Sequence, residues 1–215
     1  MELADPPYLT VVVPAYNARS RLPACLGSLF RQTYPRQRYE VIVVDDGSRD
    51  DTAEQARLLG SRWAGKFTVI RQANGGPARA RNAGMRAAAG EIVAFIDADC
   101  MADPDWLMEL ATALTTADAD AVGGPICNHT YRDWVSRFLT ASRFYRHRAA
   151  RGQVEYLVTA NLAVRRVALE ALDGFREADG TWSEDADLSF RMTKEGYSLL
   201  LAPQGRVRHF GSPTS

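Results

Sequence analysis

The chain has 215 residues, of which 46% are hydrophobic and 24% charged, and this suits one globular domain with a sizeable core. Its 26 Lys and Arg residues balance 26 Asp and Glu residues, which argues against nucleic acid as a partner. Three scattered cysteines without a CxxC pair argue against a disulfide framework or a zinc site and favour a reducing compartment.

The chain has no segment with the features of a secretion signal or a membrane span. Residues 1–7 contain neither a basic cluster nor an apolar core. No apolar run approaches the roughly 20 residues that cross a bilayer. We therefore expect a cytoplasmic protein. Residues 131–151 carry six arginines against one aspartate, a local charge of +5 within a neutral chain.

Short apolar runs alternate with helical patterns through the first half of the chain. Strands are predicted at Leu9–Val13, Val41–Val44, Phe67–Ile70, Ile92–Ile96 and Ala121–Val122. Helices are predicted at Leu22–Gln32, from Asp50 or Asp51 to Gly60, at Ala78–Ala89, and from an N-cap at Asp103 to Leu114. The alternation is typical of an α/β fold in which helices cover both faces of a mostly parallel sheet.

The second half of the chain is less regular. Trp134–Arg148 is predicted to be a basic amphipathic helix. It either packs on the sheet with its arginines in solvent or faces an anionic acceptor or the inner surface of a membrane. Shorter elements are predicted at Val158–Val164, Leu169–Leu172, Trp182–Glu195, Leu199–Leu201 and Val207–His209. We interpret residues 1–215 as one domain with two halves, at about 8–125 and about 126–215.

Two carboxylate pairs follow predicted strands of the first half. Asp97 and Asp99 end the apolar run Ile92–Ile96, and Asp45 and Asp46 end the second strand. The carboxyl ends of strands in an open α/β sheet form the edge at which ligands bind. Carboxylates held close together there repel one another, and a divalent cation such as Mg²⁺ or Mn²⁺ relieves the repulsion. The alternative for Asp97 and Asp99 is a strand that ends in a polar turn.

Several stretches together resemble family-2 glycosyltransferases. They are Val13-Pro14-Ala15-Tyr16-Asn17, Val44-Asp45-Asp46-Gly47-Ser48, Asn74-Gly75-Gly76 with Ala80-Arg81-Asn82-Ala83-Gly84, Asp97-Ala98-Asp99, and Glu184-Asp185-Ala186-Asp187-Leu188. Each motif is weak alone, but five in the family's order cover roughly residues 9–210. The resemblance implies the A-type glycosyltransferase fold with a Rossmann-like sheet. It also implies a nucleoside diphosphate sugar, a divalent metal, and inversion at the anomeric carbon.

The nucleotide is expected at the edge where the first two strands end. Pro14 and Tyr16 are candidates to pack against the base, although a tyrosine that fills a loop is the alternative. The resemblance implies that Asp46 accepts a hydrogen bond from the base, while either Asp45 or Asp46 suits the ribose. Helix capping is the alternative role for this pair.

The diphosphate and the metal are expected beside the nucleotide. Arg79 and Arg81 lie in the first turn of the Ala-rich helix, where an arginine grips phosphate well; solvent-exposed arginines are the alternative. The resemblance implies that Asp99 binds Mg²⁺ or Mn²⁺ directly and that Asp97 reaches the ribose or metal-bound water. It also implies that His209 is a third metal ligand, with a core or surface histidine as the alternative.

An inverting transfer needs a general base opposite the leaving group. The resemblance assigns that role to Asp185; the alternative is charge that stabilises a helix N-terminus. Glu184 adds like charge and, with Trp182, is a candidate to contact a sugar. Asn161 either lines the donor pocket or is a buried structural amide.

The expected function is the transfer of a sugar, most simply from a UDP-sugar, to a hydroxyl acceptor such as a lipid-linked or cell-envelope glycan. One alternative is a sugar-phosphate nucleotidyltransferase, although the loop Pro14–Asn17 lacks that class's glycines. The other is an inactive nucleotide- or carbohydrate-binding relative.

Overall fold

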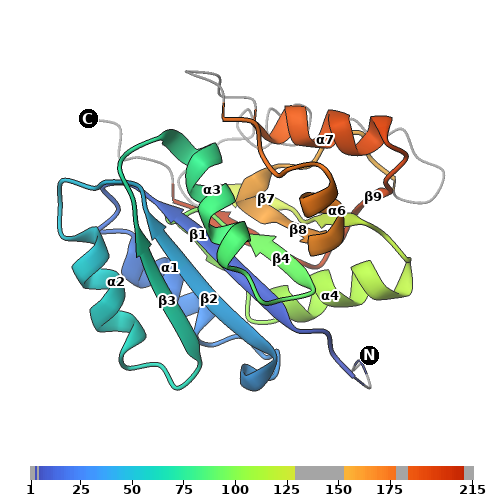
Figure 1. The fold of residues 1–215 in the computed structure, drawn as a ribbon. Helices are drawn as coiled ribbons and strands as arrows, with labels where there is room; N and C mark the ends of the chain where they lie inside the picture. Colours follow the sequence, from blue (N-terminus) through green and yellow to red (C-terminus); the bar gives the residue numbers. More distant parts are fainter. Residues whose placement is uncertain (1–2, 4, 129–152, 178–183, 211–215) are drawn as a thin grey trace.

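A seven-stranded sheet forms the centre of the computed structural model, which describes residues 3, 5–128, 153–177 and 184–210 (Figure 1). Its strands are β1 (Leu9–Ala15), β2 (Tyr39–Asp45), β3 (Lys66–Arg71), β4 (Ile92–Phe95), β6 (Ala121–Gly123), β8 (Leu162–Arg165) and β9 (Leu199–Leu201). Their order across the sheet is β3-β2-β1-β4-β8-β6-β9. Strand β8 runs antiparallel to both its neighbours, so the sheet is mostly parallel, as the sequence predicted.

Helices cover both faces of this sheet. They are α1 (Leu22–Leu29), α2 (Thr52–Gly60), α3 (Gly76–Ala87), α4 (Trp106–Thr116), α6 (Arg166–Ala171) and α7 (Glu184–Lys194). Alternate side chains of β1 enter opposite cores: Val11 and Val13 pack with α1, α2 and α4, whereas Val12 packs with α3, α6 and α7. This period of two follows from the strand pleat, and it explains why both faces of β1 are apolar.

A second, three-stranded sheet lies beside the ligand edge. It consists of β5 (Cys100–Ala102), β10 (Val207–His209) and β7 (Ile126–Asn128), in the order β5-β10-β7. Strand β10 runs antiparallel to β5 and brings His209 directly opposite Cys100. The sequence pattern did not predict β5 or β7, each of which pairs with β10, a strand distant in the sequence.

The strands of the main sheet place the predicted motifs on one edge. Strands β1 and β2 pair in parallel up to Ala15 and Asp45, so the next residues, Tyr16 and Asp46, emerge together. The N–H of Ile96 donates to the carbonyl of Val12, which sets Asp97 beside them. Gly84 lets α3 approach β1, since a Cβ there would lie 2.3 Å from Val12 Cγ1.

Some predicted boundaries are wrong by a few residues. Helix α4 begins at Trp106 and not after Asp103, because the Asp103 carbonyl accepts the Trp106 N–H in a turn that precedes the helix. Helix α3 begins at Gly76 and α1 ends at Leu29. The predicted helix Trp134–Arg148 lies outside the described residues. Among the residues that are described, no helix is long and apolar enough to cross a membrane.

Candidate active site and metal centre

A cleft of about 510 Å³ opens at the carboxyl edge of β1, β2 and β4. It is lined by Pro14, Tyr16, Asp46, Arg81, Asp97, Asp99, Glu184 and Asp185, among other residues. These eight residues were all predicted from the sequence as site residues, and they come from both halves of the chain. The cleft is therefore where the chemistry-bearing side chains of the described residues converge.

The base-binding candidates sit on two loops that are tied to each other. The Asn17 N–H donates to Ser48 Oγ, and the Arg49 N–H donates to Asn17 Oδ1, at 2.9 and 2.8 Å. Asn17 has a φ of 48°, a conformation that asparagine tolerates better than most residues. This turn presents Tyr16 to the cleft with 47% of its surface exposed, which leaves a ring face available for packing.

The Asp46 carboxylate organises the loop that leads into α3. It accepts hydrogen bonds from the N–H groups of Gly75 and Gly76 and from the side chains of Gln72 and Asn74. The capping alternative raised by the sequence concerned the helix that follows Asp46, α2, and Asp46 does not cap that helix, because its hydrogen bonds go to the loop that leads into α3. Asp46 also lines the cleft, so one carboxylate both shapes the loop and borders the cleft.

Arg81 joins the two halves of the site. Its guanidinium lies 2.9 Å from Asp97 Oδ1 and 2.6 Å from Glu184 Oε1, and Arg81 is only 3% exposed. It also lies over the Phe175 ring, 5.8 Å from its centroid. Burial alone would lower the pKa of Arg81, but the two carboxylates outweigh it and raise the pKa. The sequence analysis expected the Arg81 guanidinium to bind the diphosphate, but in this structure it pairs with two carboxylates.

Arg79 does not belong to the cleft. It lies on the same helix two residues earlier, it is exposed, and it is absent from the cleft lining. A rotation of about 200° separates residues i and i+2 on a helix, so the two arginines cannot face the same way. The structure favours the solvent-exposed alternative for Arg79.

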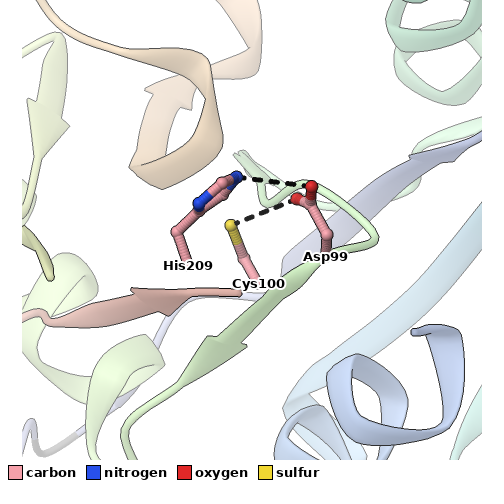
Figure 2. Close-up of side chains that lie close together, drawn as sticks. All are labelled: Asp99, Cys100 and His209. Carbon is pink, nitrogen blue, oxygen red and sulfur yellow. Dashed lines mark hydrogen bonds and ion pairs between the residues drawn. The ribbon is translucent and has the colours of Figure 1, made fainter. Parts of the chain in front are cut away.

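Asp99 is the centre of a second cluster, which Figure 2 shows. Its Oδ2 lies 3.3 Å from His209 Nε2 and 3.6 Å from an Arg21 Nη, while Oδ1 accepts from the Cys100 thiol at 3.7 Å. Burial raises the pKa of Asp99, but His209 and Arg21 outweigh it and leave the pKa below its ordinary value. The hydrogen bond to Asp99 in turn raises the pKa of His209.

The donor atoms of this cluster suit a divalent cation. One atom each from Asp99, Cys100 and His209 lies within 4.8 Å of the others, close enough for a single ion to touch all three. Carboxylate oxygen and imidazole nitrogen are ligands that Mn²⁺ accepts. Burial raises the pKa of the Cys100 thiol, which disfavours the thiolate as long as no cation is bound beside it.

Asp185 stands at the start of α7 with both carboxylate oxygens hydrogen-bonded. Oδ2 accepts from the Tyr156 hydroxyl at 2.7 Å, and Oδ1 accepts from the Ala186 N–H. Burial and the neighbouring Glu184 raise the pKa of Asp185, while Tyr156, Ala186 and Arg81 partly oppose that rise. A carboxylate that is half-buried, has a raised pKa and lines a cleft has the properties of a general base.

Asn161, one of the predicted sugar contacts, is not among the residues that line the cleft. Asn161 is 1% exposed, and its amide is used by Trp106 Nε1 and by the carbonyls of Pro125 and Gly205. It is a buried structural amide, the alternative that the sequence left open. Trp182 lies outside the described residues.

The structure adds residues that the sequence pattern did not single out. Arg21 and Thr159 line the cleft, Tyr156 donates to Asp185, and Cys100 joins the metal cluster. Only Cys100 had a local signal, since it directly follows Asp97-Ala98-Asp99. The others come from loops distant in sequence, so their proximity depends on the fold.

The comparison with family models decides the family. Residues 10–173 match the model described as glycosyl transferase family 2. The chain belongs to glycosyl transferase family 2. The match ends before α7, so Asp185 lies outside the matched residues. Membership of this family counts against a sugar-phosphate nucleotidyltransferase.

Relatives and solved structures of this family extend the match. Glycosyltransferase AglE of Haloferax volcanii is 30% identical over 203 residues, which are 91% of this chain and 64% of AglE. The mannosyltransferase PcManGT of Pyrobaculum calidifontis, in complex with GDP-Man and Mn²⁺, is 26% identical with a TM-score of 0.77 over 96% of this chain and 57% of that one. The chain thus spans about three-fifths of the length of both proteins.

A third comparison supports the fold alone. Staphylococcus aureus TarS 1–349, in complex with UDP-GlcNAc, has a TM-score of 0.78 at 21% identity, over 97% of this chain and 60% of that one. Together with PcManGT it confirms the A-type glycosyltransferase fold that the sequence motifs implied.

The link through Arg81 makes a prediction about stability. Arg81→Met removes the cation that pairs with both Asp97 and Glu184. We therefore expect a loss of about 2–4 kcal/mol in the free energy of unfolding. The cost stays below that of a fully buried pair because the Asp97 side chain is 34% exposed. Urea unfolding measures it. Arg79→Met is the matched control on the same helix and should cost less than about 0.5 kcal/mol. Equal losses in the two variants would contradict the structural role of Arg81.

Proposed function

We propose that this chain forms the catalytic part of an inverting, metal-dependent glycosyltransferase that moves a sugar from a nucleoside diphosphate to a hydroxyl acceptor. The observation that carries the proposal is the convergence of Asp46, Asp97, Asp99 and Asp185 on one cleft. This gives the chain separate carboxylates for the nucleotide, for the metal and for the proton. Their presence also argues against an inactive relative.

The nucleotide occupies the part of the cleft between the two tied loops in this proposal. Tyr16 and Pro14 pack against the base, and Asp46 accepts a hydrogen bond from a base N–H, for which uracil is the simplest fit. Asp97 reaches the ribose. The relatives differ on the base, since the TarS complex holds UDP-GlcNAc and the PcManGT complex holds GDP-Man. Our preference for UDP therefore needs a direct test.

Asp99 and His209 hold Mg²⁺ or Mn²⁺ in this proposal, with Asp97 reaching the ion through bound water. When bound, the ion acts as a Lewis acid that stabilises the negative charge of the departing diphosphate. Arg21 lies beside Asp99 and lines the cleft, so its guanidinium is placed to add positive charge at the same end. Arg81 orients Asp97 and Glu184 and is not itself a diphosphate clamp.

Asp185 takes the proton from the acceptor hydroxyl as that oxygen bonds to the anomeric carbon. The bond from this carbon to the diphosphate breaks on the opposite side, which inverts the configuration. A raised pKa makes Asp185 a stronger base than an ordinary aspartate. Glu184, held by Arg81, lines the cleft next to Asp185, and this position supports its proposed contact with a sugar.

The charge distribution of the sequence supports a proposal about the acceptor and its location. We infer a hydroxyl of a lipid-linked or cell-envelope glycan, reached at the inner face of the membrane. The support is the local charge of +5 at residues 131–151, which suits an anionic acceptor or membrane surface. These residues lie outside those that the structure describes.

Donor binding tests the metal and nucleotide together. We expect UDP to bind in calorimetric titration with Mn²⁺, and Asp99→Ala to lower that affinity at least about tenfold because a metal ligand is lost. GDP and dTDP titrated in parallel identify the base. Asp103→Ala is the control, since Asp103 pairs with Arg208 outside the cleft lining. Weak binding that ignores Mn²⁺ would count against the proposal.

The general base makes a second prediction. Asp185→Asn should lower kcat by about 10²–10⁴-fold, the usual contribution of a positioned base, and leave UDP binding unchanged. Asp187→Asn is the matched control on the same helix, because Asp187 pairs with Arg176 and Arg191 instead of lining the cleft. Near-normal turnover of Asp185→Asn would show that the base lies elsewhere.

The hydrogen bond from Tyr156 makes a prediction about pH dependence. Its hydroxyl stabilises the ionised form of Asp185, so Tyr156→Phe should raise the pKa of that carboxyl further. The base works only when ionised. The acidic limb of kcat/KM should therefore move to higher pH, by up to about one unit for a charge-assisted hydrogen bond.

The control for this profile is Tyr197→Phe, which removes a hydroxyl from a tyrosine outside the cleft lining. The acidic limb of the kcat/KM profile of Tyr197→Phe should lie at the same pH as that of the unmodified chain. A limb that Tyr156→Phe leaves in place, or moves to lower pH, would show that Tyr156 does not tune Asp185.

A further inference from the structure

We propose that Asp99, Cys100 and His209 form a sulfur-containing metal site that binds thiophilic divalent cations such as Zn²⁺ in preference to Mn²⁺. The inference rests on the proposed metal site at Asp99 and His209 and adds the thiol as a ligand. Zn²⁺ bound there would exclude Mn²⁺ from the same carboxylate and imidazole, so zinc is expected to inhibit donor binding.

The backbone builds this cluster from two directions. The Cys100 N–H donates to the Asp97 carbonyl at 3.0 Å, and this turn folds Cys100 back beside Asp99. His209 arrives on β10 as the residue directly opposite Cys100 on β5. Directly opposite residues of antiparallel strands have their Cβ atoms about 4.5–5.5 Å apart on the same face. The Phe210 N–H donates to the Asp99 carbonyl and fixes the register at this point.

The donor atoms lie within reach of a single cation, since one ligand atom from each of the three residues lies within 4.8 Å of the others. His209 Nε2 is 3.3 Å from Asp99 Oδ2, and Cys100 Sγ is 3.7 Å from Asp99 Oδ1, so imidazole and thiol face different oxygens of the same carboxylate. Figure 2 shows the three side chains directed toward one another.

The donor set decides which ion is preferred. The affinity of a mixed site for first-row divalent ions rises from Mn²⁺ toward Cu²⁺ and stays high for Zn²⁺, and a thiolate widens this difference. Zinc binding forms a Zn–S bond as the Cys100 S–H bond breaks, and the proton leaves to solvent. Mn²⁺ gains little from sulfur, so it depends mainly on the oxygen and nitrogen donors.

Cobalt absorption tests the thiol ligand without any assay of sugar transfer. Co²⁺ substitutes for Zn²⁺ and gives a near-ultraviolet charge-transfer band when a thiolate binds it. The variant Cys25→Ala/Cys127→Ser leaves Cys100 as the single thiol of the three in the chain. We expect it to show the band with Co²⁺. Absence of the band from this variant would overturn the proposal.

Cys100→Ser on the Cys127→Ser background is the matched comparison. It should abolish the band, weaken Zn²⁺ binding at least about tenfold, and change Mn²⁺ binding by less than about threefold. A band that persists, or a zinc affinity that does not change, would overturn the proposal. If Cys100→Ser does not fold, the single-thiol variant still decides the question.

The outcome is separable from that of the proposed function. A cobalt band together with UDP binding that ignores Mn²⁺ would support this site and count against the glycosyltransferase proposal. Mn²⁺-dependent UDP binding without a cobalt band would support the glycosyltransferase proposal and overturn the proposed sulfur-containing site.

Discussion

The arrangement of the cleft depends on one shared guanidinium. Arg81 is buried between Asp97, which follows β4, and Glu184, which begins α7, so a single cation holds together carboxylates that are far apart in the sequence. Taking such charges out of water is costly unless each is paired. The neighbouring Asn82 bonds both backbone groups of Phe175, whose ring lies under Arg81. Helix α3 therefore positions both sides of the site.

Every other carboxylate of the cleft also has its own partner. Asp99 has His209 and Arg21, Asp185 has Tyr156, and Asp46 has the N–H groups that lead into α3. These partners differ in charge, and so do their effects: cations keep the pKa of Asp99 low, whereas the burial of Asp185 beside Glu184 raises its pKa. Similar side chains thus acquire different chemistry from their surroundings.

The sequence was sufficient for the sheet and for the residues that follow its strands. Buried strands such as Val41–Val44 are long enough to show their period, and parallel pairing then fixes where Asp46 and Asp97 emerge. It was not sufficient for contacts between distant loops. Tyr156 and Arg21 carry no local signal, Arg79 and Arg81 look equivalent until the helix is placed, and Asn161 reveals its structural role only through Trp106, Pro125 and Gly205.

The charge of the cleft explains why a metal belongs to the proposed function. Among the described residues, five carboxylates line it against two arginines, Arg21 and Arg81. Arg81 is already shared by Asp97 and Glu184, so the lining stays negative toward an incoming diphosphate. Like charges in a site of reduced dielectric repel strongly. In the proposed function, a nucleoside diphosphate sugar would therefore enter with a cation or after one, and Asp99 with His209 is the proposed place for that cation.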